Sequence, residues 1–255
     1  MNMKIIKLGG SIITKKKGWQ EANLENIRML AKVVAKVWKK SDREWILIHG
    51  AGSFGHPLVI EYDLNNGVKS TKQKLGMART HKSCIELSML LVDALQKEGV
   101  PAISIPPAAI TISKNKRIYS FDGKKVEDYL EAGFFPVLFG DMVPDIELGG
   151  SVCSGDQLIS YLGKKAELII HATNVDGVLD DSGNVIPVIT KANFHEMSVD
   201  LTKKDKDVTG AMKGKISELL GLDTPSIIIN GLKAERVEAA MLGKKVYGTM
   251  VGTDK

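Results

Sequence analysis

The feature that most constrains the fold is a short apolar segment, residues 4–8, that runs directly into Gly9, Gly10 and Ser11. Glycine allows a sharp turn and a close approach of the backbone to a ligand. Successive backbone N–H groups in such a turn form a concave site for an anion, and Lys7 adds positive charge two residues before the first glycine. A strand that ends in a glycine turn is typical of α/β proteins, in which strand-end loops and helix N-termini bind phosphate groups.

Apolar segments and amphipathic segments alternate along the rest of the chain. This alternation predicts an α/β fold with a mainly parallel sheet and helices on both of its faces. We expect strands at 4–8, 45–48, 101–105, 134–139, 167–172, 226–229 and 246–251, a hairpin at 110–122, and helices at 23–40, 73–97, 155–164, 210–222 and 234–242. Pro144, Gly149 and Gly150 interrupt the pattern and indicate a soft boundary near residues 145–151.

Composition favours a small anionic partner over nucleic acid. The 255 residues carry a formal net charge of +5, but aromatic residues make up only 5%, which leaves few platforms for base stacking. Cys84 and Cys153 lie far apart and do not predict a disulfide framework or a zinc site. No apolar run reaches membrane-spanning length and no signal peptide is evident, so we expect a cytoplasmic protein without membrane contact.

A second glycine-rich loop, residues 49–57, follows the apolar run at 45–48. It contains G-x-G-x-x-G, which is also the fingerprint of dinucleotide-binding proteins. That function requires an acidic residue after the next strand, and a polar stretch from Glu61 to Lys74 follows here instead. We interpret the loop as a second phosphate-binding loop with His56 as a hydrogen-bond donor; a helix cap at His56 is the alternative.

Two further segments favour the same chemistry. Asp156 follows Ser154 and Gly155 near the start of a predicted helix, where it is either part of an ordinary helix cap or a carboxylate that holds two lysines around a phosphoryl group. Residues 172–178 follow a buried strand, and residues 207–215 open a helix with Lys213 in its first turn. The chain contains no G-x-x-x-x-G-K-[ST] motif and is therefore not a P-loop enzyme.

Lys-Leu-Gly-Gly-Ser at 7–11, Asp-Gly-Val at 176–178 and Asp-Val-Thr-Gly-Ala-Met-Lys at 207–213 resemble the amino-acid kinase superfamily. Gly-Ala-Gly-Ser-Phe-Gly-His-Pro at 50–57, the segment 136–141 and Ser-Gly-Asp at 154–156 narrow the resemblance to the isopentenyl phosphate kinases. The resemblance implies an open αβα sandwich and a homodimer. It also implies an acceptor-binding lobe at 1–148, a nucleotide-binding lobe at 149–255, and transfer of phosphate from ATP, with Mg²⁺, to isopentenyl phosphate.

The resemblance also implies roles for individual residues. The catalytic set is Lys7, Lys16, His56, Asp156 and Lys213. Asp156 would orient Lys7 and Lys213. Because Lys15 and Lys17 flank Lys16, the sequence does not decide which of these three lysines is the one in the active site. The acceptor would contact Ala51, Gly55, His56 and Gly155. ATP would contact Lys7, Gly9, Gly10, Ser11, Gly52, Thr173, Asp176, Gly210 and Lys213. No protein side chain is expected to hold a metal ion by itself.

Three points stay open at this level. Ala51 stands where the family often has a third glycine, which is tolerable if its φ is negative. The helix around Cys84, Ile85, Ser88 and Met89 is either a wall of the pocket for the isoprenoid tail or simple core. The alternatives to this function are a kinase of another small phosphate or phosphonate such as fosfomycin, and a non-catalytic nucleotide-binding protein. Dimethylallyl and isopentenyl phosphate are not distinguished as acceptors.

Overall fold

An eight-stranded sheet forms the centre of the molecule. A computed structural model describes residues 3–15, 18–41, 44–180, 182–194 and 208–252. The strand order is β10-β12-β11-β9-β1-β2-β6-β3, and every pair is parallel except β11 with β12. The strands are β1 (Lys4–Leu8), β2 (Trp45–His49), β3 (Ala102–Ser104), β6 (Phe135–Phe139), β9 (Leu168–Thr173), β10 (Val188–Ile189), β11 (Ser226–Asn230) and β12 (Thr249–Val251).

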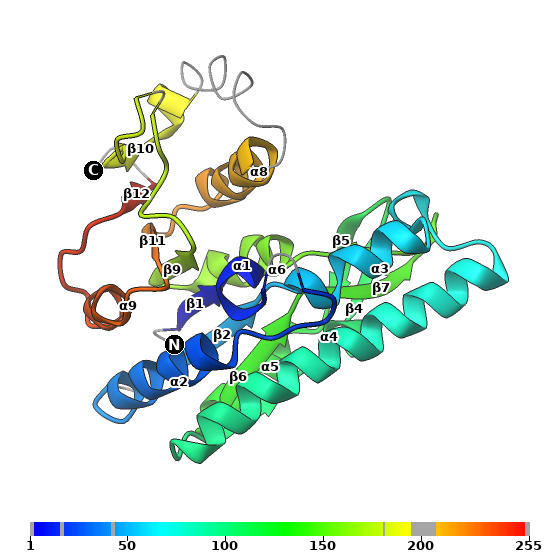
Figure 1. Cartoon of the computed structure of the whole chain (residues 1–255), viewed down its shortest axis with the longest axis horizontal. Helices are drawn as coiled ribbons and strands as arrows, with labels where there is room; N and C mark the ends of the chain where they lie inside the picture. The colour runs from blue at the N-terminus through cyan, green and yellow to red at the C-terminus, as the bar shows by residue number, and fades with distance from the viewer. Residues whose placement is uncertain (1–2, 16–17, 42–43, 181, 195–207, 253–255) are drawn as a thin grey trace.

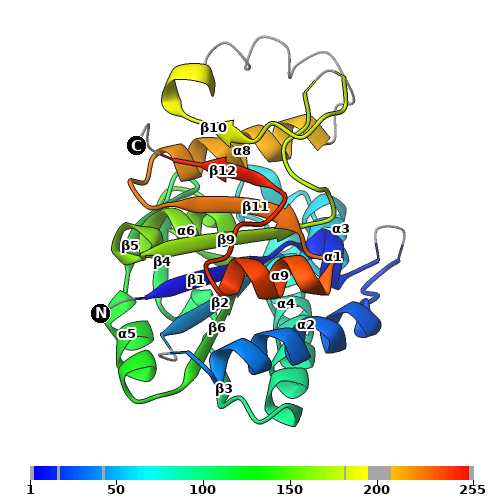
Figure 2. The ribbon, with the colours of Figure 1, turned by 90° about the vertical axis from the view of Figure 1, so that its left-hand side faces the viewer.

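Helices cover both faces of this sheet. One apolar core joins the sheet to α2 (Leu24–Trp38), α4 (Thr71–Lys97) and α9 (Ala234–Met241). A second core joins the opposite face to α5 (Gly123–Glu131), α6 (Gly155–Leu162) and α8 (Val208–Leu220). In Figure 2, α9 and α2 cross in front of the strands. The predicted mainly parallel sheet between two helical layers is therefore confirmed.

Side-chain alternation along the strands explains this three-layer arrangement. Successive side chains of a strand point to opposite faces. In β1, Ile6 and Leu8 enter the core under α2 and α9, whereas Ile5 enters the core under α6 and α8. Lys7 has the parity of Ile5, so the fold directs its amino group toward α6 and α8, into an otherwise apolar face.

A smaller four-stranded sheet lies toward the α3 and α4 end of the molecule (Figure 1). Its order is β5-β4-β7-β8, built from β4 (Thr111–Lys114), β5 (Arg117–Phe121), β7 (Asp141–Asp145) and β8 (Gly149–Cys153). The break in pattern near residues 145–151 is the turn of the antiparallel β7–β8 hairpin. The proposed lobe boundary at residue 148 falls within this turn, while the central sheet runs without interruption from β3 to β10.

Short helices that periodicity did not predict complete the chain. They are α1 (Gly10–Ile13), α3 (His56–Glu61) and α5, with single 3₁₀ turns at Gly52–Phe54, Leu64–Asn66, Pro107–Ala109 and Gly163–Lys165. Four to nine residues are too few for a helical repeat to be distinguished from a loop. Cys84 and Cys153 are buried and free. No helix in the described ranges is long and apolar enough to cross a membrane.

Candidate active site

The loops that the sequence predicts to bind phosphate meet at one edge of the central sheet. They follow the carboxyl ends of β1, β2, β6 and β9, which are neighbours in the sheet. Backbone hydrogen bonds continue past the strand ends: the Gly50 N–H donates to the Leu8 carbonyl at 2.9 Å, and the Gly140 N–H donates to the His49 carbonyl at 2.9 Å. In parallel sheets, this edge is where ligands bind.

The first two glycine loops pack against each other through their backbones. A Cβ added to Gly10 would lie 2.5 Å from the Gly52 nitrogen, and one added to Gly50 would lie 2.7 Å from the Gly10 nitrogen. Gly52 has φ +51°, a conformation that favours glycine. Ala51 has φ −75°, so the third glycine of the family pattern is not needed here. Thr14 ties the loops together, because its hydroxyl donates to the Gly10 carbonyl at 2.8 Å and accepts from the Ser53 N–H at 3.1 Å.

This packing yields a stability prediction. Gly10→Ala places a methyl group against the Gly52 backbone, which cannot rotate away as a side chain would. We expect a loss of about 1–3 kcal/mol in the free energy of unfolding, and a lower kcat because the loop shifts. Gly214→Ala is the control, because a Cβ there meets nothing within 4 Å. Denaturant unfolding of both variants measures the difference; equal stability would show that the loops are not in backbone contact.

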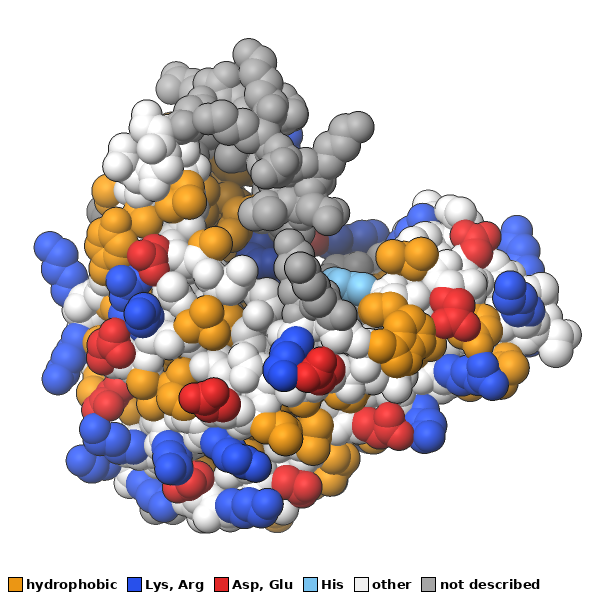
Figure 3. All heavy atoms as spheres, in the orientation of Figure 1, with side chains coloured by type: hydrophobic (Ala, Val, Ile, Leu, Met, Phe, Trp, Pro, Cys, Tyr) orange, Lys and Arg blue, Asp and Glu red, His pale blue; other side chains and the backbone are white. Residues whose placement is uncertain are grey.

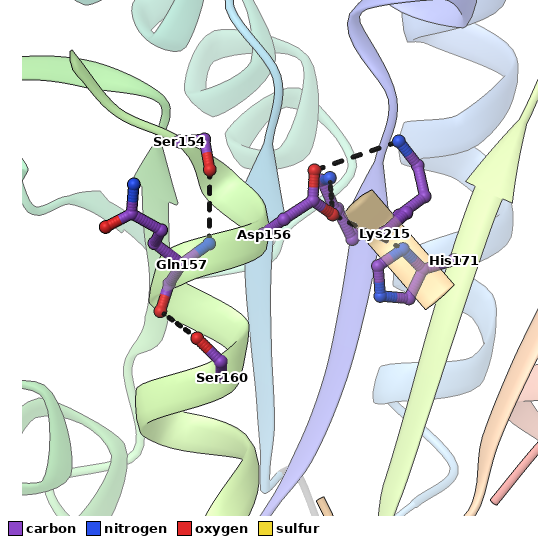
Figure 4. Close-up of polar contacts among 7 residues, drawn as sticks. Ser154, Asp156, Gln157, Ser160, His171 and Lys215 are labelled. Atoms are coloured by element: carbon purple, nitrogen blue, oxygen red, sulfur yellow. Dashed lines mark hydrogen bonds and ion pairs between the residues drawn. The ribbon is translucent and has the colours of Figure 1, made fainter. Parts of the chain in front are cut away.

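A largely buried ion-pair cluster lies beside these loops (Figure 4). The amino group of Lys7 contacts Oδ1 of Asp156, and the amino group of Lys215 lies 3.7 Å from Oδ2 of the same carboxylate. Nδ1 of His171 lies 3.9 Å from Oδ1. Lys7 is only 4% exposed. Asp156 is in the first turn of α6, where the helix dipole favours a negative charge.

Burial and charge shift the pKa values of this cluster. Burial lowers the pKa of Lys7 to about 8, with Asp156 opposing this shift and Lys215 adding to it. Burial alone would raise the pKa of Asp156, but the charges of Lys7 and Lys215 outweigh it and hold the pKa well below its usual range. Two lysines and one carboxylate leave a net positive charge at the strand ends. Such a site is suited to groups that carry several negative charges, such as phosphates.

The structure differs from the predicted arrangement at two residues. Asp156 pairs with Lys7 and Lys215, whereas Lys213 was expected at that position. The N–H of Gly9 was expected to face a phosphate, but it donates to the Ala172 carbonyl at 2.9 Å and so belongs to the sheet. The helix cap of α6 is Ser154, whose hydroxyl accepts from the Gln157 N–H, so Asp156 is not the cap.

The residues predicted to contact the acceptor lie close to the cluster. A Cβ on Gly155 would be 3.3 Å from Cε of Lys7, and one on Gly140 would be 3.6 Å from the nitrogens of both Ala51 and Gly155. Gly55 packs on Ala51 and lies against Cys84 of α4. The absence of side chains at these glycines therefore lets the second loop, the end of β6 and the start of α6 pack closely around Lys7.

His56 is the first residue of α3, the N-cap residue of this helix is Gly55, and the His56 side chain is exposed. The helix-cap alternative is therefore not what the structure shows. Partial desolvation of the ring lowers the pKa of His56, and the charge of Lys215 lowers it further. The influence of Lys215 places the imidazole in the electrostatic field of the same cluster.

The residues predicted to contact ATP lie along the strand ends and α8. Gly10 and Ser11 open α1. Thr173 ends β9, and a Cβ on Gly9 would be 3.8 Å from its Cα. The carboxylate of Asp176 accepts hydrogen bonds from Asn230 at 2.8 Å and from Arg236 at 2.7 Å, and no described contact joins it to the lysine cluster. Gly210 and Lys213 belong to α8, and Lys16 lies outside the described residues.

Lys215 and His171 were not predicted. Lys213 and Lys215 are about 200° apart around a helix, so both cannot face Asp156. The buried residue Ile216 follows Lys213 by three positions, and the buried residue Leu219 follows Lys215 by four. Both spacings place a lysine near the buried face of the helix, so periodicity does not predict which lysine faces Asp156. The signal for His171 is a histidine inside an apolar strand, Leu168–Thr173, that is buried on both faces.

Comparisons with known proteins place the chain in a family. The model of the "Amino acid kinase family" matches residues 2–222. The chain belongs to the amino acid kinase family. Within it, the chain is 36% identical to the isopentenyl phosphate kinase of Methanothermobacter thermautotrophicus and 34% identical to that of Methanocaldococcus jannaschii, each match covering 98% of both chains. A crystal structure of isopentenyl phosphate kinase superimposes with a TM-score of 0.84 at 33% identity, covering 98% of this chain and 100% of the other. The expected family and fold are confirmed.

Proposed function

We propose that this protein is an ATP-dependent kinase that converts isopentenyl phosphate into isopentenyl diphosphate, a step of isoprenoid synthesis by an alternative mevalonate route. The observation that carries the proposal is the Lys7–Asp156–Lys215 cluster beside two interlocked glycine loops and His56. Relatives that match over nearly the whole chain are named for this substrate. None of those reported above is named for fosfomycin or for a non-catalytic protein.

The chemistry follows from the charges. An oxygen of the acceptor phosphate attacks the γ-phosphorus of ATP, the bond from that phosphorus to the β,γ-bridging oxygen breaks, and ADP leaves. The acceptor oxygen is already ionised near neutral pH, so the site needs no strong base. Phosphoryl transfer depends mainly on positioning and on positive charge around the transferred group. Lys7 and Lys215 supply that charge, and Asp156 keeps both amino groups at one point.

Mg²⁺ belongs to this proposal as a companion of ATP. Among the described residues, no three His, Cys, Asp or Glu side chains form a group that could hold a metal ion. Asp156 is already paired with two lysines. The ion would therefore be held mainly by the ATP phosphates, where it neutralises charge during transfer. The cytoplasmic location and the homodimer are parts of the same proposal.

The proposal assigns the acceptor to residues 1–148 and the nucleotide to residues 149–255. The predicted wall for the isoprenoid tail is mostly core: Cys84 and Ser88 are fully buried, and Met89 is 42% exposed. α3 is better placed for this role, because it begins at His56 and contributes the buried side chain of Leu58 to an apolar cluster. The other buried members of that cluster are Val59, Tyr62, Leu64, Val68 and Met142.

ADP release tests the proposal. Purified protein with ATP and Mg²⁺ is offered isopentenyl phosphate, dimethylallyl phosphate, fosfomycin, acetylglutamate, carbamate and UMP in turn. Turnover with isopentenyl phosphate, alone or with its isomer, supports the proposal. Turnover with another acceptor only would keep the kinase and overturn the substrate. No turnover with tight ATP binding would favour the non-catalytic alternative.

His56→Ala examines the acceptor assignment. We expect kcat/KM for isopentenyl phosphate to fall on the order of 10²-fold, because one hydrogen-bond donor to a phosphate is lost. The Kd for ATP should stay within a factor of about two, and His56→Gln, which retains an N–H donor, should recover part of the rate. Calorimetric titration with ATP and steady-state kinetics measure both. Unchanged turnover in His56→Ala would remove this residue from the acceptor site.

A further inference from the structure

His171 is a buried histidine whose ring has no hydrogen-bond partner among the residues that the structure describes. It lies in β9, in register with Lys7 of β1 and with Ile228 of β11. Its parity is that of Ile169, so its ring points to the same face of the sheet as Lys7. The side chain is 1% exposed, and neither ring nitrogen has a hydrogen-bond partner in the described part of the chain. Figure 4 shows the ring directed at Asp156.

Such a group is costly and calls for a physical reason. A buried polar atom without a partner destabilises the folded protein, and each such atom in a native structure calls for an explanation. Burial holds the pKa of His171 well below its ordinary value, and Lys7 lowers it further while Asp156 opposes the shift. The ring is therefore neutral and offers one N–H donor and one acceptor nitrogen.

Asp156 is the only carboxylate among the described partners of Lys7 and Lys215. If those amino groups turn toward phosphates during the reaction, the carboxylate of Asp156, whose side chain is only 23% exposed, loses its donors. A largely desolvated carboxylate without donors is disfavoured. Nδ1 of His171 is 3.9 Å from Oδ1, so a movement of about 1 Å would bring it into hydrogen-bond distance.

We propose that His171 is a positioning residue whose ring N–H donates to Asp156 when Lys7 and Lys215 engage the phosphates of the substrates. This inference rests on the proposed kinase function. His171 itself touches no reacting atom. It keeps the carboxylate in place, so that both lysines return to the same geometry in each catalytic cycle.

The kinetic test compares three proteins. His171→Phe fills the space without a donor, and His171→Asn retains an N–H near the position of Nδ1. We expect kcat of His171→Phe to fall on the order of tenfold, the effect of losing one hydrogen bond to a charged group, while the KM values for ATP and isopentenyl phosphate stay within a factor of about two. His171→Asn should recover most of kcat. Equal kcat in wild type and His171→Phe, or an equal loss in both variants, overturns the proposal.

Two measurements separate failure of this inference from other failures. Thermal melts establish that each variant folds, and His171→Leu replaces His171→Phe if the larger ring does not fit. Imidazole ¹⁵N spectra of the wild type, assigned with His171→Asn, report the ring without any turnover. We expect a neutral ring whose protonated nitrogen shifts when ATP and Mg²⁺ bind. An unchanged or doubly protonated ring at saturating nucleotide overturns the proposal for His171. This spectral test does not depend on turnover. An inactive wild type with isopentenyl phosphate would refute the proposed function separately.

Discussion

Lys7→Ala is expected to lower kcat by about 10²–10³-fold, as for the loss of one preorganised donor to developing charge. Lys7 is nearly buried and its amino group contacts Asp156 at the strand ends. Its neighbours on that face of β1 and β2 are apolar, so Lys215 alone would remain as a lysine on Asp156. Steady-state ADP release measures the effect.

The control is Lys82→Ala, which removes a solvent-exposed lysine of α4 and should leave kcat unchanged. The melting temperature of Lys7→Ala shows whether Asp156, left with Lys215 alone, destabilises the fold. A kcat within a factor of about three of wild type in a folded Lys7→Ala protein would exclude a role for Lys7 in transfer.

The pKa of Lys7 adds a pH dependence to this prediction. With a pKa lowered to about 8, the amino group of the free protein loses its charge as the pH rises through 8. Because the charged form is the active one, kcat/KM for ATP, which reports the free protein, should fall above about pH 8. Lys7→Arg stays charged throughout this range. If its lower activity shows the same alkaline fall as the wild type, a group other than Lys7 causes it.

Lys215→Ala is expected to lower kcat by a similar factor, about 10²–10³-fold, while Lys213→Ala should change it by less than about threefold. The two lysines share α8 and the same charge, so the pair is a matched control for net charge and for the helix. Only Lys215 lies within 4 Å of Asp156 in the structure. The two variants therefore separate the effect of position from the effect of charge.

The same kinetic assay, with a melt to confirm folding, measures both variants. A large loss in Lys213→Ala with little change in Lys215→Ala would restore the assignment that the sequence motif suggested. It would also mean that Asp156 does not orient the transferring lysine. Equal, small losses of kcat in both variants would show that neither lysine supplies the charge that stabilises the transferred phosphoryl group.

Local signals of the sequence led to most of the fold. The apolar run at 45–48 is continuous because β2 is buried on both faces. Two glycines precede Ser11, where β1 turns sharply into α1. The same signals failed where an element is short or amphipathic over few residues. Periodicity does not predict α5, and it indicates the β7–β8 hairpin only as an interruption of the pattern.

Motifs predict some residues of the candidate site, and other assignments stay untested. Lys7, Gly10, Gly52 and Asp156 were predicted from motifs, and the structure brings them together. Their proximity arises because parallel strands end at one edge, which is a property of any chain with this pattern. The ATP assignments at Thr173, Asp176 and Gly210 stay predictions, since no ligand contact tests them.

Local patterns of the chain predict the buried strands, the glycine turns after them and the lysines beside those turns. These features depend on local periodicity and on the backbone freedom of single residues. Local patterns do not predict which lysine of α8 meets Asp156, or that His171 lies beside Lys7. Those choices depend on the rotation of α8 about its axis and on the order of β9 beside β1. Such facts come from packing between segments far apart in the chain, and no local pattern contains them.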